Sequence, residues 1–190
     1  MLLAKKTFSK SYLVTILFFF GTTFTASAVE KTKPINLSLV PDIAIYKRTQ
    51  KIEGFTLSIW GENETRGLGI GIVNGTRGDS VGLSWGIVNY ADKFTGAQIG
   101  AVNWAKKNFV GFQGGLVNCA VGPMTGFQWG AVNYAEKMKG LQLGFVNYAQ
   151  TAESGVQVGF VNVIPETKGF FTEFPKTVAP FMILANWRFK

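Results

Sequence analysis

The chain lacks histidine altogether and contains a single cysteine, Cys119. Histidine is the usual general base and the commonest metal ligand, so its absence removes the catalytic and metal sites that depend on imidazole. One cysteine cannot form an intramolecular disulfide, and without histidine it cannot complete a zinc site of the Cys/His type. We therefore expect a protein that is not an enzyme and that holds no metal or other cofactor.

Charged residues are also scarce, at 16% of the chain, and no pair of acids recurs at a spacing that would place it in one cleft. The stretches Gly69-Ile70-Gly71 and Gly114-Gly115 resemble parts of phosphate-binding loops, but each lies within a predicted strand rather than between a strand and a helix. Nucleic-acid binding is disfavoured because the net charge is modest once the first segment is set aside.

The first 28 residues have the features of a secretory signal peptide. Lysines precede an apolar run from Leu13 to Phe20, and Ala26-Ser27-Ala28 supplies a small-x-small cleavage site. The apolar run is shorter than the roughly 20 residues that a membrane-spanning helix needs. We expect cleavage after Ala28, which removes three lysines and no acid and so lowers the net charge from +8 to +5.

A Val-Asn dipeptide recurs seven times after this segment, at intervals of 14 or 15 residues. The consensus of the units is Gly-φ-Gln-φ-Gly-φ-Val-Asn-aromatic-Ala, where φ is apolar, as in GLQLGFVNYA. Near-constant spacing of this kind indicates a tandem array. The asparagines of the seven units are Asn74, Asn89, Asn103, Asn118, Asn133, Asn147 and Asn162.

Within a unit the side chains alternate with a period of two, which predicts a β-strand. Leu141, Leu143 and Phe145 share one face of the strand. Gln142 and Val146 belong to the other face. The polar segments between units are short enough to be turns.

The array lies within a longer all-β chain. Residues 29–66 contain two alternating segments that predict two leading strands and a loop, and residues 67–164 hold the seven repeats. Residues 165–190 predict a proline-punctuated connector followed by a terminal strand. The sequence therefore predicts about ten strands.

The repeats GLQLGFVNYA and GFQWGAVNYA, with the INLSLVP strand before them and the ILANWRF ending after them, resemble the bacterial surface-repeat proteins. The resemblance covers roughly residues 35–189, and it implies an exported bacterial surface protein with no catalytic residues to transfer. The chain departs from the pattern at Gly114, where an apolar residue is usual, at Cys119, which replaces the aromatic residue, and at Val163 in the last unit.

Three architectures fit an array whose strands carry no charge on either face. The first, which we expect, is an up-and-down antiparallel β-barrel of about ten strands in an outer membrane, with apolar side chains toward lipid and Gln, Gly and Ser inside. The second is a parallel β-solenoid, in which Asn and Gln would form ladders along the axis. The third is a soluble β-barrel or sandwich with its apolar face inward.

Every charged residue between positions 67 and 164 lies in a segment that connects two strands. In an antiparallel array these segments alternate between two rims, and one rim would be basic. Such a rim suits anionic lipid headgroups or the phosphates of a surface polysaccharide. The candidate contact residues are Arg77, Lys106, Lys107, Lys137 and Lys139.

The predicted function is structural or based on interaction. We expect an exported protein of the outer membrane or cell surface, whose partner is outer-membrane lipid or surface polysaccharide and not nucleic acid; the sequence specifies no protein partner. The alternative is a secreted β-solenoid that acts as an adhesin-like binding module, and a small pore is a minor alternative.

Overall fold

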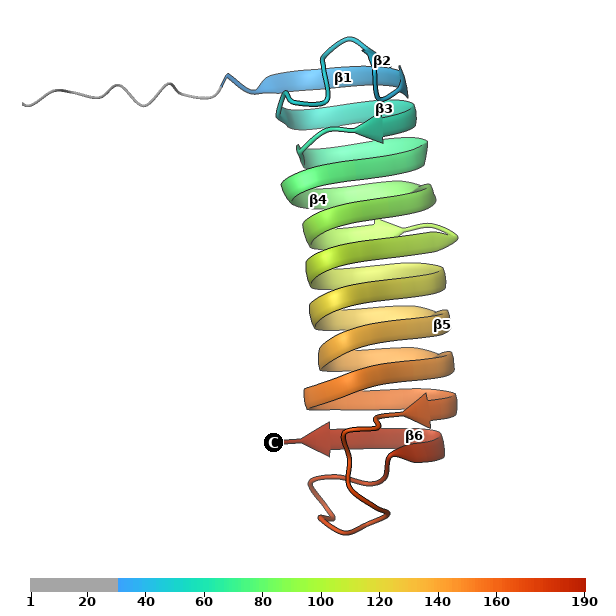
Figure 1. Cartoon of the computed structure of the whole chain (residues 1–190). Coiled ribbons are helices and arrows are strands. Elements are labelled where there is room, and N and C mark those ends of the chain that lie inside the picture. Colours follow the sequence, from blue (N-terminus) through green and yellow to red (C-terminus); the bar gives the residue numbers. More distant parts are fainter. Residues whose placement is uncertain (1–30) are drawn as a thin grey trace, which may run out of the picture. The chain divides into compact units, whose positions relative to one another are not determined.

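The repeat units wind into a parallel β-solenoid in which each unit forms one coil (Figure 1). This computed structural model describes residues 31–190, so the predicted signal peptide lies outside the described residues. The strands are β1 (Lys33–Val40), β2 (Ile43–Ala44), β3 (Ile52–Glu62), β4 (Thr65–Ile99), β5 (Val102–Val163) and β6 (Phe181–Phe189).

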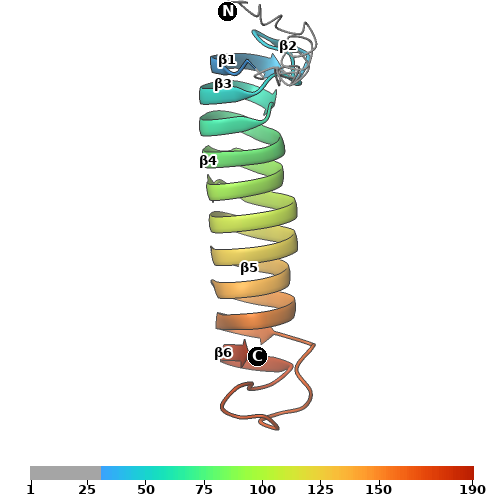
Figure 2. The ribbon, with the colours of Figure 1, turned by 90° about the vertical axis from the view of Figure 1, so that its left-hand side faces the viewer.

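Successive coils are parallel and in register. β1 pairs with β3, β3 pairs with β4, and β4 pairs with β5, all in parallel, so that for example Asn89 lies beside Asn103. β4 and β5 continue through several coils without interruption, as the winding ribbon in Figures 1 and 2 shows. β6 closes the stack by pairing antiparallel with the end of β5.

The fold is therefore all-β, as predicted, but the expected antiparallel barrel is wrong and the solenoid alternative is correct. An antiparallel barrel requires each unit to reverse direction against the one before it. Here the short polar segments do not reverse the chain, because each carries it round to the start of the next coil. The ten predicted segments still lie side by side: β1, β3, one segment from each of the seven repeats, and β6.

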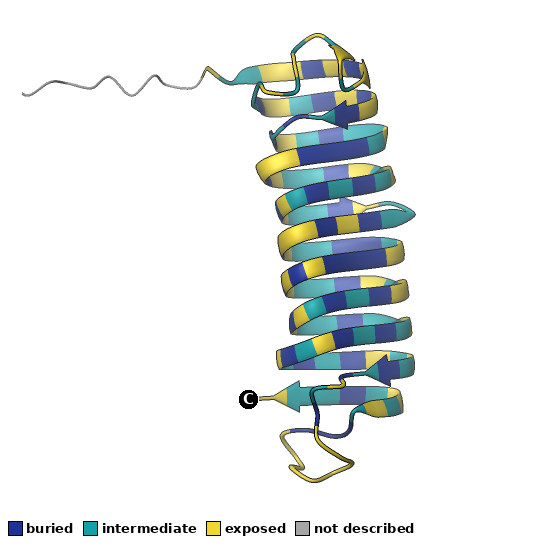
Figure 3. Cartoon of the chain, in the orientation of Figure 1, coloured by how far each residue is buried: buried dark blue, intermediate teal, exposed yellow. Residues whose placement is uncertain are grey.

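Each coil has two flanks that meet at two corners. The apolar flank starts at a corner glycine and holds three outward apolar residues, as in the range 126–131. The polar flank starts at the repeat asparagine, as in the range 133–139. At the corner between the two flanks the predicted alternation of inward and outward side chains is broken. Val146 lies on the outer side and is half-exposed, and the next residue, Asn147, is buried. Along much of the array buried residues alternate with more exposed ones, whereas residues 74–76 and 118–120 form continuous buried runs (Figure 3).

Glutamine and asparagine side chains form two ladders inside the solenoid. Gln128 Nε2 donates to Gln113 Oε1 at 2.8 Å, and Gln142 Nε2 donates to Gln128 Oε1 at 2.7 Å. Asn118 Nδ2 donates to Asn133 Oδ1 at 2.9 Å. These side chains are fully buried, where an amide without partners would cost about 1–3 kcal/mol. The ladders are those that the solenoid alternative predicted.

The two ladders run in opposite directions. From Gln113 onward each glutamine of the ladder donates toward the preceding coil, as Gln113 does to Gln98 at 2.9 Å. Each asparagine donates toward the following coil, as Asn89 does to Asn103 at 2.8 Å. Two ladder atoms without a partner, Gln98 Nε2 and Gln157 Oε1, are found where the glutamine ladder ends.

The same amides also bind the backbone. Asn118 Nδ2 donates to the carbonyl oxygen of Trp129 in the next coil at 2.9 Å. Gln128 Nε2 donates across the interior to the carbonyl oxygen of Tyr134 at 3.0 Å. Gln128 therefore links the apolar flank of its coil to the polar flank of the same coil.

The apolar part of the core lies behind the polar flank. The alanine that five of the seven repeats carry is buried there, and a larger side chain such as Phe109 or Met138 fills the space beside it. Phe109 stacks on Phe94 of the preceding coil, with ring centroids 6.3 Å apart. The core thus combines an apolar strip with two amide ladders.

Two glycines of the repeat are required by the close approach of the neighbouring coil, except that the last corner glycine, Gly155, meets the side chain of Met138 instead. Gly126, at the corner, has φ of 134°, and a Cβ there would lie 2.0 Å from the carbonyl oxygen of Gly111. Gly130 faces inward, where a Cβ would lie 2.6 Å from Asn118 Nδ2. Neither position has room for a side chain.

The variation between 14 and 15 residues is confined to the polar flank. From corner glycine to asparagine the spacing is always seven, as from Gly82 to Asn89 and from Gly96 to Asn103. The register shifts by one residue between Ala91 and Lys93, on the polar flank. An extra residue there forms a bulge and leaves the ladders aligned.

Both ends of the stack are capped. At the start, β2 pairs antiparallel with β1, within the segment predicted to be a loop. At the other end the predicted terminal strand is confirmed as β6, and the connector before it returns to pair Thr177 with Arg188. Asn186 lies beside Gln157, the last residue of the glutamine ladder, and donates to the carbonyl oxygen of Ala179 at 2.9 Å.

Asn118→Ala is expected to lower the free energy of unfolding by roughly 3 kcal/mol, because it removes hydrogen bonds to Asn103, Asn133 and the Trp129 carbonyl group. Urea denaturation followed by circular dichroism measures the change. The matched control, Asn108→Ala, alters an exposed asparagine and should cost less than about 0.5 kcal/mol. Equal losses in the two variants would show that the ladder adds nothing to stability.

Candidate functional site

The outer surface of the apolar flank exposes large apolar side chains along the whole array. Leu116, Trp129 and Phe145 have exposed fractions of 65%, 62% and 64%. No charged residue between positions 67 and 164 lies on this surface. An apolar surface of this extent marks a contact site, because isolated proteins seldom leave one open to water.

Two hollows lie on this surface. One is lined by Ile99, Phe112, Gly114, Trp129 and Phe145 and occurs where Gly114 replaces the usual apolar residue. The second lies at the N-terminal end of the array. It is lined by Leu37, Ser38, Leu39, Ile43, Ala44, Ile45, Leu57, Ser58 and Ile59.

The polar flank carries all of the charge of the repeats. The predicted division into two rims is wrong, because parallel coils place every connecting segment on the same side of the stack. Ion pairs therefore join neighbouring coils: Lys93 Nζ lies 3.0 Å from Asp79 Oδ1, and Lys106 Nζ lies 3.6 Å from Asp92 Oδ1. The ten charged residues on this flank, six of them basic, are Arg77, Asp79, Asp92, Lys93, Lys106, Lys107, Glu136, Lys137, Lys139 and Glu153.

The five predicted contact residues share this flank but differ in their surroundings. Lys106 pairs with an acid and lies 5.7 Å from the centre of a tyrosine ring. Lys107, Lys137 and Lys139 are exposed and form no ion pair within residues 31–190. Arg77 binds Glu62 at 2.6 Å and belongs to a separate cluster. The structure therefore groups the four lysines and sets Arg77 apart.

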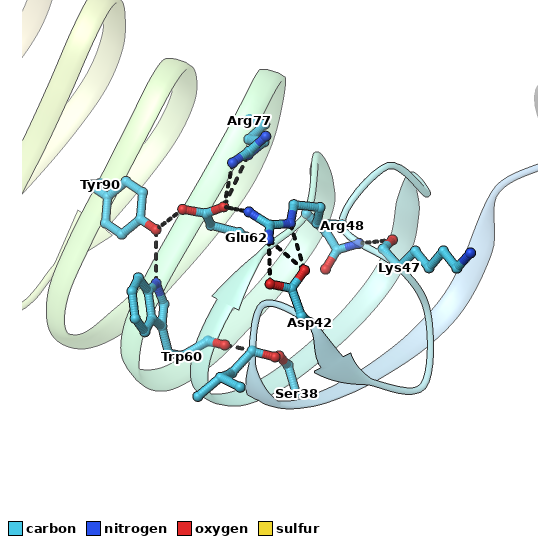
Figure 4. Close-up of polar contacts among 10 residues, drawn as sticks. Ser38, Asp42, Lys47, Arg48, Trp60, Glu62, Arg77 and Tyr90 are labelled. Atoms are coloured by element: carbon cyan, nitrogen blue, oxygen red, sulfur yellow. Dashed lines mark hydrogen bonds and ion pairs between the residues drawn. The ribbon is translucent and has the colours of Figure 1, made fainter.

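Glu62 is the centre of that cluster, near the N-terminal end of the array (Figure 4). Its carboxylate accepts hydrogen bonds from Arg77 at 2.6 Å, from Arg48 at 3.3 Å and from the Tyr90 hydroxyl at 2.6 Å. Trp60 Nε1 in turn donates to the Tyr90 oxygen at 2.9 Å. The sequence analysis missed this cluster, although Arg77 follows Glu62 by the repeat spacing of 15.

The cluster holds the first coils together rather than presenting a reactive group. Burial raises the pKa of Glu62, but the hydrogen bonds from Tyr90 and Arg77 and the charges of Arg77 and Arg48 outweigh it, so the pKa is lower than usual. Burial and the bond to Glu62 raise the pKa of Tyr90 to about 12. Arg48 also binds Asp42, which fixes the loop between β1 and β3. Since these groups satisfy one another, we assign the cluster a structural role.

The aromatic residues of the repeats divide between the flanks. Trp129 stands on the apolar flank, whereas Tyr134 and Tyr148 stack on the polar flank with ring centroids 5.6 Å apart. Cys119 occupies the aromatic position of its unit and is a buried free thiol whose pKa is raised by burial. A buried thiol of raised pKa is a weak nucleophile, so Cys119 acts here as a small packing residue in the place of the usual aromatic one.

Residues 31–190 contain no group of three or more Cys, Asp or Glu side chains placed to hold a metal ion. Within the same residues no helix has the length and apolar character needed to span a membrane. Comparison with protein-family models, curated proteins and solved structures finds no match. The resemblance to bacterial surface-repeat proteins therefore rests on the repeat unit, and the stacked asparagines at 14- to 15-residue spacing are consistent with tandem repeats.

Glu62→Gln is expected to lower the free energy of unfolding by roughly 1–2 kcal/mol at pH 7, because an amide cannot accept all the bonds that the carboxylate accepts. The folded pKa is depressed, so this stabilisation is present above the unfolded value near 4.5 and is lost as the pH falls through the folded value. Urea denaturation between pH 7 and pH 3 tests this. The gap between wild type and variant should close at the acid end.

Glu153→Gln, at an exposed site, provides the control for loss of one negative charge. A gap for Glu62→Gln that stayed constant down to pH 3 would contradict the role given to the ionised carboxylate.

Proposed function

We propose that the protein is a non-enzymatic, exported scaffold that associates peripherally with the outer membrane or cell surface through its polar flank. The observation that carries the proposal is the segregation of charge, which the repeats confine to one flank. A stack of this kind offers an extended surface with regularly spaced side chains, which suits contact rather than catalysis.

The lysines of the polar flank are suited to phosphate groups. Lys106 and Lys107 lie two coils from Lys137 and Lys139, which corresponds to roughly 10 Å along the stack. The polar flank of the coil between them, at residues 118–125, carries no charge. Exposed ammonium groups attract phosphate oxygens at about 1 kcal/mol per lysine near an anionic surface. The partner is thus a phosphate-bearing surface, either anionic lipid or polysaccharide.

A second candidate is a secreted binding module with the same fold, and the change from barrel to solenoid favours it over an integral membrane protein. A pore is not part of the proposal, because buried side chains such as Gln128, Asn133, Phe109 and Met138 fill the space inside the coils. Cell fractionation distinguishes the two candidates. A peripheral protein sediments with the outer membrane and is released by high salt, whereas a secreted module is found in the medium.

Replacement of Lys106, Lys107, Lys137 and Lys139 by glutamine is expected to weaken binding to vesicles containing phosphatidylglycerol by roughly a hundredfold at low salt. The wild-type affinity should also fall as salt rises, because exposed charges are screened within a Debye length. Co-sedimentation at several salt concentrations measures both effects.

The control replaces four lysines of the chain ends, Lys31, Lys47, Lys168 and Lys176, and produces the same change in net charge. Equal loss of binding in the two variants would remove the polar flank from the proposal. Parallel assays with a phosphorylated polysaccharide, and with the same polysaccharide after dephosphorylation, separate the two phosphate sources. If the wild type binds none of these surfaces, the proposal is wrong.

A further inference from the structure

The outward side chains of the apolar flank form three columns along the stack, and their sizes differ from coil to coil. In the middle column Gly114 is followed in the next coil by Trp129, and in the next column Leu116 is followed by Ala131. Ala101 and Phe145 occupy the same column as Leu116, one coil before it and two coils after it. The array is therefore not a uniform apolar sheet.

The sizes in one copy complement those in a second copy if the two copies are related by a two-fold axis in a particular place. This two-fold line runs parallel to the strands, midway between the coils of Gly114 and Trp129. A two-fold rotation about this line keeps each column in place and inverts the order of the coils. Each small residue of the central coils then faces a large one: Trp129 faces the partner's Gly114, Leu116 the partner's Ala131, Phe145 the partner's Ala101, and Leu141 the partner's Ala97.

We infer that the apolar flank is covered by a second copy of the chain, which packs face to face and antiparallel about this two-fold line. Trp129, which is 62% exposed, enters the partner's hollow beside Gly114 and packs on the ring of the partner's Phe112, which lies over that glycine; the partner's Trp129 does the same in return. A two-fold contact of this type is self-complementary and closed, so it stops at two copies.

Neighbouring registers fit less well. If the line is shifted to the coil of Gly114, Trp129 faces the partner's Ile99. If it is shifted to the coil of Trp129, this residue faces the partner's Trp129. Packed sheets lie about 10 Å apart, so Trp129 fits best where it faces a glycine, although this register also places Phe112 against the partner's Phe127. Gly114, the departure from the repeat pattern, thus determines the register.

The area available matches a stable dimer. The line lies between the sixth and seventh of the ten segments, so eight segments overlap with a partner. Six residues per segment and strands about 4.8 Å apart give a face of roughly 20 by 38 Å, or about 750 Å² per copy. Specific interfaces bury about 800 Å² on each partner, and those of homodimers are rich in apolar side chains.

The two segments that overhang, β1 and β3, meet a second feature of the partner. The loop before β6 exposes Phe170, Phe171 and Phe174, and Phe174 contacts Trp187 at a centroid distance of 6.3 Å. Trp187 pairs with Val156 on the outer side of β6, so the loop borders the apolar flank. In the antiparallel dimer this loop reaches the N-terminal hollow of the partner, which exposed aliphatic residues line.

A lipid surface fits the same flank less well. A face that lies on a membrane is usually bordered by lysine and arginine for the headgroups. Here one long edge of the flank is a row of valines and carries no charge within the repeats. The residues of this row are Val73, Val88, Val102, Val117, Val132, Val146 and Val161.

Analytical ultracentrifugation of protein recovered from cells that express the full chain should give the mass of a dimer in the absence of lipid. Trp129→Lys is expected to raise the dimer dissociation constant by roughly a hundredfold or more, since it places an unpaired charge in the interface. Thr125→Lys adds the same charge at an exposed site outside the apolar flank and should leave the dimer intact. Circular dichroism checks that both variants are folded.

Cross-linking tests the register even if a variant at Trp129 fails to fold. In a Cys119→Ala background, the double variant Ala101→Cys/Phe145→Cys should form a covalent dimer with a bismaleimide of roughly 8 Å reach. Within one chain these two positions lie three coils apart, about 14 Å, which is beyond that reach. Each single variant should give no covalent dimer, because its thiols in the two copies are also three coils apart.

Covalent dimers from a single variant would overturn the antiparallel register. A monomeric wild type at all concentrations would overturn the dimer. If the monomer instead binds neutral phosphatidylcholine vesicles and Trp129→Lys abolishes this, lipid is the occupant of the flank. These results leave the proposed role of the lysines untouched, because that role depends on anionic vesicles, salt and the opposite flank.

Discussion

The fold depends on the hydrogen bonds between buried side-chain amides in successive coils. A glutamine or asparagine inside a protein is costly unless its donors and acceptors are used, and here the identical residue one coil away uses them. This requirement fixes the register of every coil, since a shift of one residue would leave the amides of both ladders unpaired. It also explains the inward glycine, because a Cβ at Gly130 would collide with the amide of Asn118.

Because amides and small residues occupy the interior behind the apolar flank, large apolar side chains remain on the outside. Residues such as Leu116 and Phe145 therefore contribute little to the core of a single chain, although they dominate the hydropathy of the repeat. The apolar core is built instead from alanine and from side chains such as Phe109 and Met138, behind the polar flank. Stability and contact are thus assigned to different residues of one repeat.

The sequence predicted the strands, the array and the ladders of the solenoid alternative, because each follows from the spacing of chemically distinct residues. It did not distinguish the solenoid from the barrel. The alternation of Leu141 with Gln142 is the same in a barrel and in a solenoid. The two folds differ at the corner, where Val146 lies outward in the solenoid although strict alternation would place it inward. The sequence predicted which segments carry charge. That these segments all lie on one flank follows from the parallel pairing of the coils, which the sequence did not predict. The Glu62 cluster was missed because the repeat spacing was not extended upstream to residues 48–62.

The opposed directions of the two ladders bear on how long such a protein can become. Each side-chain amide carries a dipole, and a single ladder would add these dipoles head to tail and accumulate partial charge at its ends. With glutamines oriented toward one end and asparagines toward the other, most of this field cancels in the five coils that carry both residues. A gene that duplicates one unit therefore lengthens the rod without increasing its polarity. The dipoles of the ladders therefore set no limit on the length of the array.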